Sequence, residues 1–204
     1  ILDELWHGSG VMHVPQRTQE IFERLYPLIL STTGKLAEPN LALARFANFV
    51  GRYGSRGLLY ELLARNGKLI EMLLRLCDAS KFFADTLAGQ PDLFDVVCRD
   101  VEIPAEEIHA WKRAEMLRIG IADVMGEADV EHVHLQLTRL AETCLRAAVK
   151  RARGFTVIGL GKFGGQELGY GADLDVLFVG DTVTGATLAA KVIEFMSRRT
   201  EAGR

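Results

Sequence analysis

Apolar residues recur at helical spacing through about the first 150 residues. In residues 17–30, "RTQEIFERLYPLIL", the side chains of Ile21, Leu25 and Leu28 follow one another at intervals of three or four. That spacing places them on one face of a helix. Shorter segments with the same pattern follow, separated by brief polar or glycine-rich joints, and no fixed-period repeat is evident. The pattern predicts a bundle or array of helices.

Several residues indicate where these helices begin and end. Pro39 is placed to open a helix, because proline fits the first helical turn. Asn66-Gly67 predicts a left-handed cap at the C-terminus of the preceding helix. Ser80 is positioned to cap the N-terminus of the helix that follows it. We expect the segment 89–91, Gly-Gln-Pro, to end that helix and start another.

Two longer helical patterns cover residues 105–126 and 129–154. In the second, Val133, Leu137 and Leu140 share a face with later apolar positions. Its C-terminal end is basic, where positive charge suits the helix dipole. A phosphate- or partner-binding patch is the alternative interpretation of this basic cluster, which consists of Arg146, Lys150, Arg151 and Arg153.

The pattern changes after residue 154. Residues 155–160, "FTVIGL", are short, apolar and rich in β-branched side chains, which predicts a buried strand. Residues 174–180, "LDVLFVG", predict a second strand, and a helical pattern returns over 184–200. We therefore expect a mainly α chain with a C-terminal α/β (α+β) portion, with domains over 1–125 and 126–204.

Composition supports a soluble globular protein and excludes some partners. The chain has 204 residues, of which 49% are hydrophobic and 25% charged, with a net charge of -3. This balance gives no reason to expect nucleic-acid binding. No apolar run approaches the roughly 18 residues that a membrane helix needs, and no signal peptide is visible. Because the chain opens on Ile1 without an initiator Met, we expect it to be an excerpt of a longer protein.

The cysteines fit a reducing compartment. Cys77, Cys98 and Cys144 are far apart in the sequence, and their odd number argues against a disulfide framework. Free cysteine commonly serves as a small core residue. We therefore expect a cytoplasmic protein.

The segment Gly159-Leu-Gly161-Lys-Phe-Gly164 has the form of a dinucleotide-binding loop. That fold needs a crossover helix of about a dozen residues before the next strand. Here the next strand begins about nine residues after Gly164, which leaves too little chain. A Walker A loop is also excluded, because Lys162 is followed by Phe163 and not by Ser or Thr. The short spacing favours antiparallel or skewed neighbouring strands.

Asp173 and Asp175 directly precede the apolar run of the second strand. Residues i and i+2 of a strand point to the same side, so both carboxylates would project together while Leu174 and Val176 face the core. Adjacent carboxylates repel unless a cation lies between them. Oxygen ligands of this kind suit Mg²⁺, which completes its shell with water and phosphates. Lys162 would add positive charge.

Residues 159–178, "GLGKFGGQELGYGADLDVLF", carry a longer motif. The motif is similar to G-x-G-K-x-G-G-x-E-L, a short spacer, S-D-x-D and an apolar strand of the nucleotidyltransferase superfamily. It most closely resembles the glutamine synthetase adenylyltransferase family. Residues 57–97 and 113–145 resemble the helices that precede a catalytic domain in that family, so the likeness covers most of the chain beyond about residue 40.

The resemblance implies an enzyme with two related catalytic domains. One transfers AMP from ATP to a tyrosine of glutamine synthetase, and the other removes it by phosphorolysis; PII-type proteins and glutamine set the balance. This chain resembles the linker helices and the first part of the adenylylating domain, with a short mixed sheet. The deadenylylating domain and a non-catalytic helical interaction module are the alternatives. The implied residues are Asp173 and Asp175 for catalysis and Mg²⁺, and Lys162, Gly164 and Gly165 for nucleotide binding.

The chain departs from the family pattern at two points. Ala172 stands where the family usually has Ser, so a hydroxyl beside Asp173 is missing. The family's third carboxylate follows a segment resembling "RRTEAGR", residues 198–204. Glu194 and Glu201 are not placed as substitutes. We therefore expect residues 1–204 alone to have little or no transfer activity.

Overall fold

The computed structural model describes residues 1–8, 14–99, 107–149, 155–180 and 182–197. The chain divides into two compact units, Ile1–Asp100 and Val101–Arg204. Over its described residues the first unit is helical. Its elements are α1 (Leu2–His7), α2 (Gln16–Thr33), α3 (Pro39–Arg52), α4 (Arg56–Arg65), α5 (Gly67–Ala79), α6 (Lys81–Gly89) and α7 (Asp92–Cys98).

The helices of the first unit pack through aromatic and aliphatic side chains. Helix α2 packs on α4 and α5, and α3 packs on α5 and α6. Phe22, Phe46 and Phe49 are completely buried, and each such side chain contributes about 1.5–3 kcal/mol relative to exposure. The Asp78 carboxylate accepts hydrogen bonds from the N–H groups of Ala37 (3.0 Å) and Glu38 (2.9 Å). These two bonds fix the segment that leads into α3 against the end of α5.

Most helix boundaries agree with the sequence, with two corrections. Pro39 begins α3, and the Ser80 hydroxyl caps α6 by accepting from the N–H of Phe83. The cap predicted at Asn66-Gly67 is wrong: Asn66 is extended, and its side chain accepts from the N–H of Lys68 to begin α5. Leu28, expected on the buried face of α2, is 37% exposed.

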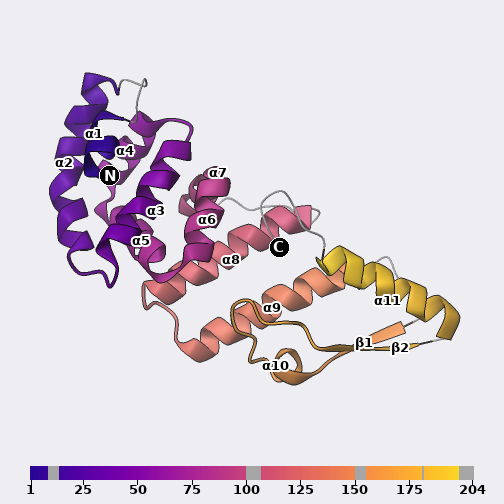
Figure 1. Ribbon diagram of the computed structural model, residues 1–204. Coiled ribbons are helices and arrows are strands. Elements are labelled where there is room, and N and C mark those ends of the chain that lie inside the picture. The colour runs from indigo at the N-terminus through magenta and orange to yellow at the C-terminus, as the bar shows by residue number, and fades with distance from the viewer. Residues whose placement is uncertain (9–13, 100–106, 150–154, 181, 198–204) are drawn as a thin grey trace. The chain divides into compact units, whose positions relative to one another are not determined.

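The second unit combines helices with a small sheet (Figure 1). Helix α9 packs against both α8 and α11, and α11 also contacts β2. In the figure, the strands form a ribbon with α10 at one end. The elements are α8 (Ile108–Val124), α9 (Val130–Val149), β1 (Phe155–Gly159), α10 (Gly161–Gly164), β2 (Val176–Gly180) and α11 (Thr182–Ser197).

Strands β1 and β2 pair antiparallel, as the short spacing between them predicts. Thr156 lies opposite Val179, and Gly159 lies opposite Val176. A two-stranded sheet is marginally stable by itself and depends on packing against other elements. The described part of the chain supplies that packing through α10 and α11, which contact β1 and β2 respectively.

The core of the second unit unites α8, α9 and the glycine-rich segment. Because α8 contributes Ile119 to this core, the compact unit begins earlier than residue 125. The start of a catalytic domain near residue 126 stays a prediction about function. The buried residues of this core are Ile119, Val133, Leu137, Leu140, Phe163 and Leu168.

Three other expectations concern the helices. Cys77 and Cys144 are buried, Cys98 is half-buried, and all three are free thiols. In the basic cluster, Arg146 pairs with Glu142 on α9, while Lys150, Arg151 and Arg153 lie outside the described residues. Across the described ranges, none of the helices combines the length and the apolar character needed to cross a bilayer.

Candidate functional site

The glycines after β1 allow the chain to fold back tightly on itself. A Cβ atom at Gly164 would lie 2.5 Å from the carbonyl oxygen of Gly159. A Cβ atom at Gly159 would lie 2.9 Å from the ring of the buried Phe163. Contacts this short do not occur at real Cβ atoms, so Gly164 requires glycine, and a side chain at Gly159 would displace the buried ring of Phe163. The motif therefore makes a strand-to-helix turn of one helical turn, in place of a dinucleotide loop with a long crossover helix.

Gly161 holds the turn against the acidic pair. Its φ angle is +52°, a left-handed conformation that suits glycine. A Cβ atom at this position would lie 2.5 Å from Oδ2 of Asp175. The N–H of Leu160 donates to the carbonyl oxygen of Asp175 at 2.8 Å, which continues the ladder beyond β2. The carboxylate of Asp175 is thus held directly over the backbone of the turn.

The two carboxylates lie on one exposed face. Asp173 and Asp175 are exposed, whereas Leu174 and Val176 are half-buried and pack against the core of the second unit. This is the predicted alternation, although the ladder itself begins only at Val176. Within the described ranges, neither carboxylate forms an ion pair or a side-chain hydrogen bond.

The donor set fits a hydrated divalent cation that is shared with phosphates. Mg²⁺ commonly takes one or two carboxylates from a protein and keeps water and substrate oxygens as its other ligands. Asp173 and Asp175 supply that number. No group of three or more metal-ligating side chains occurs among the described residues. Such a pair therefore fits a cation that is bound together with a nucleotide, and not one that is enclosed by protein ligands alone.

The other predicted binding residues lie on or beside α10. Lys162 is exposed on α10. The N–H groups of Gly164 and Gly165 donate to the carbonyl oxygens of Leu160 (2.8 Å) and Gly161 (2.9 Å). These two N–H groups are therefore already engaged within the turn. The role of Gly164 and Gly165 in nucleotide binding stays a prediction.

The segment between α10 and β2 approaches the helices at two points that the sequence did not reveal. The N–H of Leu168 points to the buried hydroxyl of Thr138 on α9, at 3.4 Å. Partial burial, and after it the neighbouring carboxylate of Asp123 on α8, raises the pKa of Tyr170. Tyr170-Gly171 carries a turn signature, but no local pattern links it to Asp123.

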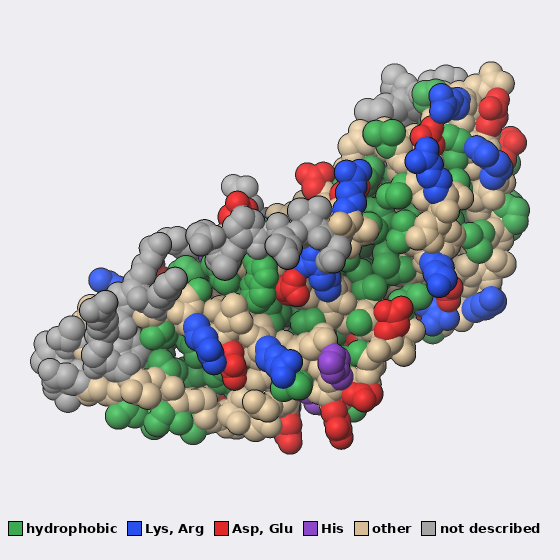
Figure 2. Space-filling model, turned by 180° about the vertical axis from the view of Figure 1, so that it is seen from behind, with side chains coloured by type: hydrophobic (Ala, Val, Ile, Leu, Met, Phe, Trp, Pro, Cys, Tyr) green, Lys and Arg blue, Asp and Glu red, His purple; other side chains and the backbone are tan. Residues whose placement is uncertain are grey.

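Beyond the acidic pair, the same face of the ribbon becomes apolar. Ile158 faces Leu177 across the strands, and Thr156 faces Val179. Ile158, Leu160, Leu177 and Val179 are each between 44% and 49% exposed. Figure 2 shows hydrophobic side chains gathered along the edge of the molecule formed by β1 and β2.

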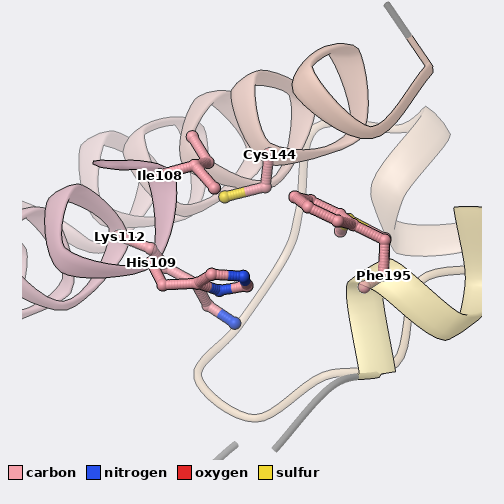
Figure 3. Close-up of a pocket in the computed structure, with 6 residues that line it drawn as sticks. Ile108, His109, Lys112, Cys144 and Phe195 are labelled. Atoms are coloured by element: carbon pink, nitrogen blue, oxygen red, sulfur yellow. The ribbon is translucent and has the colours of Figure 1, made fainter. Parts of the chain in front are cut away.

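A separate small cavity lies between α8, α9 and α11 (Figure 3). The rings of His109 and Phe195 contact each other across it, with centroids 5.3 Å apart. Its volume of about 20 Å³ is enough for a single water molecule. Burial raises the pKa of the Cys144 thiol, and nearby Lys112 opposes this effect. The lining residues are Ile108, His109, Lys112, Cys144, Phe195 and Met196.

A glycine turn beside an exposed pair of carboxylates is an arrangement suited to transfer chemistry on metal-bound nucleotides. A sequence model of the glutamate-ammonia ligase adenylyltransferase family matches residues 97–203. The chain therefore belongs to this family of adenylyltransferases.

Individual relatives agree with this assignment. The chain is 29% identical to a bifunctional glutamine synthetase adenylyltransferase/adenylyl-removing enzyme of Mannheimia succiniciproducens, with 99% of the chain and 27% of the relative covered. It is 28% identical to the enzyme of the same name from Idiomarina loihiensis, with 92% of the chain and 26% of the relative covered. It is 26% identical to the enzyme of the same name from Thioalkalivibrio sulfidiphilus, with 89% of the chain and 24% of the relative covered. The chain thus spans about a quarter of the length of these relatives.

Proposed function

We propose that this chain is part of a cytoplasmic enzyme that transfers AMP from ATP to a tyrosine of glutamine synthetase. The observation that carries the proposal is the pair Asp173 and Asp175 on one exposed face, with Asp175 held against Gly161. The family and the names of the relatives support the reaction and the protein substrate. The sequence resemblance adds a PII-type protein as a regulatory partner.

Each residue of the site has a distinct task in this proposal. Asp173 and Asp175 would bind Mg²⁺, which supplies neutralisation of charge at the triphosphate. Gly164 and Gly165 would form the tight turn beside which the nucleotide phosphates bind. Lys162, exposed on α10, would attract the anionic nucleotide to this face. The half-buried Leu174 and Val176 anchor the strand so that its carboxylates keep a fixed direction.

The test replaces one carboxylate by an uncharged carboxamide in the full-length protein. Asp173→Asn keeps the size of the side chain and removes its charge. We expect the rate of AMP incorporation from radiolabelled ATP into glutamine synthetase to fall at least about 100-fold, because a metal ligand contributes several kcal/mol to the transition state. The melting temperature should stay unchanged, since Asp173 is exposed.

A matched control is available on α11. Glu194 is also exposed, and Glu194→Gln removes the same charge from the same unit. We expect this variant to keep wild-type activity. Near-normal labelling by Asp173→Asn would refute the assignment of the site, and a loss with Glu194→Gln would show that the carboxylate set has been chosen wrongly.

The same variants separate the two activities named for the relatives. We assign Asp173 and Asp175 to AMP transfer, so Asp173→Asn should spare the phosphate-dependent release of AMP from modified glutamine synthetase. Loss of AMP release with retention of transfer would instead place this chain in the adenylyl-removing domain.

A purely structural role for the chain is tested by ligand binding. If residues 1–204 form only a helical interaction module, calorimetric titration with Mg-ATP should show no binding that depends on Asp175. We expect weak binding that Asp175→Asn abolishes, without AMP transfer by this chain alone. AMP transfer by residues 1–204 would show that two carboxylates suffice.

A further inference from the structure

We propose that Gln166 binds the phosphates of the nucleotide, as a hydrogen-bond donor that acts beside Lys162. This inference rests on the proposed function, because it adds a binding residue to the same site. Gln166 directly follows the glycine pair of the turn, and its side chain is exposed. Its role is inferred from its backbone conformation, from the hydrogen bonds of the turn and from the lack of another partner for its side chain.

Gln166 has a backbone conformation that favours glycine. Its φ angle is +61°, in the left-handed region. The other described residues with a positive φ angle are all glycines, namely Gly8, Gly126, Gly161 and Gly171. Among residues with a side chain, asparagine, aspartate and histidine are the ones enriched in this region. Glutamine therefore occupies position 166 at a cost in stability that glycine would avoid.

The hydrogen bonds at the end of α10 impose this conformation. The N–H of Glu167 donates to the carbonyl oxygen of Lys162 at 2.8 Å. The N–H of Gln166 donates to the carbonyl oxygen of Phe163 at 3.3 Å. These two bonds form a Schellman motif, in which the residue after the C-cap is left-handed and is usually glycine. Gly165 is the C-cap of α10, so Gln166 stands where that glycine would be expected.

The backbone between residues 164 and 167 has no N–H group left for a phosphate. The first two N–H groups donate within the turn of α10, and the next two form the Schellman motif. A phosphate bound beside this stretch must therefore take its hydrogen bonds from side chains. In residues 161–168, "GKFGGQEL", only Lys162 and Gln166 carry a side-chain donor, because the carboxylate of Glu167 only accepts.

The side chain of Gln166 has no structural task that would offset its strained conformation. It is exposed, and it forms no hydrogen bond with its side chain among the described residues. Residues held in sparsely populated backbone conformations cluster at active sites and ligand-binding turns. A carboxamide offers two N–H donors without charge, and a hydrogen bond to an ionised acceptor is stronger than one between neutral groups. Gln166 would thus add direction to the attraction that Lys162 provides.

Gln166 lies near enough to the acidic pair for one nucleotide to contact both. Gly161, at the start of α10, lies against the carboxylate of Asp175. Gln166 is five residues further along, which corresponds to about 8 Å at the helical rise of about 1.5 Å per residue. A triphosphate whose cation is bound at the acidic pair can span this distance together with the long side chain of Gln166.

The kinetic test uses the full-length protein with three replacements. Gln166→Ala keeps the strained backbone and removes the carboxamide, so KM for ATP should rise about tenfold, as for the loss of a hydrogen bond to a charged group. KM for glutamine synthetase should not change. Gln166→Gly should raise KM for ATP equally and also raise the melting temperature, because glycine relieves the strain. Gln166→Glu keeps the shape but lacks the donors and repels phosphate, so its KM for ATP should rise further.

A matched control exists in the first unit. Gln16 is exposed on α2, and its carboxamide donates to Glu20 at 3.3 Å. Gln16→Ala therefore removes a carboxamide away from the turn and should keep the wild-type KM for ATP. An equal rise in Gln16→Ala and Gln166→Ala would contradict a specific contact. A wild-type KM for ATP in Gln166→Ala, or a Gln166→Gly variant no more stable than the wild type, would overturn the inference.

Binding measurements test the contact without AMP transfer. In calorimetric titration of the full-length protein with Mg-ATP, without glutamine synthetase, Gln166→Ala should bind about tenfold more weakly than the wild type. Inorganic triphosphate should weaken by the same factor as a competitor, because the contact is with phosphate. Equal affinities for either ligand, or no binding by the wild type, would overturn the inference. If the wild type binds Mg-ATP but transfers no AMP, the proposed function fails, and the affinities still decide the role of Gln166.

Discussion

Replacing Gly161 by alanine tests how closely the acidic pair depends on the glycine turn. The added Cβ atom would lie 2.5 Å from Oδ2 of Asp175, whereas ordinary contacts begin at about 3.4 Å. The backbone around Gly161 is tied to the residue before β2 by the bond from the N–H of Leu160 to the carbonyl oxygen of Asp175. The carboxylate is the more movable partner, because it is the end of a short exposed side chain. We therefore expect it to swing away by about 1 Å.

The expected loss of stability is modest, and the expected loss of activity is large. A non-glycine residue in the left-handed region costs about 1–2 kcal/mol, and rotation of an exposed carboxylate adds little to this. Misplacement of a catalytic group by about 1 Å costs on the order of 100-fold in rate. Gly161→Ala should thus lower the free energy of unfolding by about 1–2 kcal/mol and AMP transfer by about 100-fold.

Gly126 provides a control for backbone strain alone. Its φ angle is +72°, and a Cβ atom there would meet no atom within 4 Å. Gly126→Ala should therefore lose a similar amount of stability and keep its activity. In addition, Gly161→Asn should not restore activity, because asparagine tolerates the left-handed region but still carries a Cβ atom.

The assay combines urea denaturation with transfer of radiolabelled AMP by the full-length variants. The decisive quantity is the difference in activity between Gly161→Ala and Gly126→Ala at matched stability. If the two variants lose the same activity, or if Gly161→Asn is as active as wild type, contact between Gly161 and Asp175 does not control the site.

Two further predictions concern the first unit. Asp78→Ala removes both bonds to the N–H groups of Ala37 and Glu38, so it should lower the free energy of unfolding by about 1–2 kcal/mol. The stability of Asp78→Asn should fall between those of the wild type and Asp78→Ala. Unchanged unfolding of Asp78→Ala in urea would contradict this prediction. Burial raises the pKa of the Cys77 thiol from 9.0 to about 12, so the unfolded state loses its proton first as the pH rises through this window. The free energy of unfolding should then fall by up to about 1.4 kcal/mol per pH unit between pH 9 and 12. This fall should be less steep in Cys77→Ala, which lacks the thiol. Equal slopes in the wild type and in Cys77→Ala would refute the argument that burial raises the pKa of Cys77.

Local patterns in the sequence were sufficient for most helices and for the pairing of the strands. Periodic apolar residues bury one face of α2 through Ile21, Phe22 and Leu25, because the helical period depends only on neighbouring residues. The short distance between the strands excludes a crossover, since a parallel pair needs more chain. The errors at Asn66 and Leu28 have another origin. An Asn-Gly pair fits the end of one helix or the beginning of the next, and packing between helices decides which.

The sequence by itself determined that Asp173 and Asp175 face the same way, since strand side chains alternate whatever surrounds them. It also determined that a glycine turn precedes them. Only the tertiary structure decided how the acidic pair is supported: Gly161 lies under Asp175, and Leu174 packs against the core that α8 and α9 form. These contacts join residues far apart in the chain, and their geometry is set by how α8, α9 and the ribbon pack around one core. The type and spacing of the site residues are therefore local properties, and their support is a property of the fold.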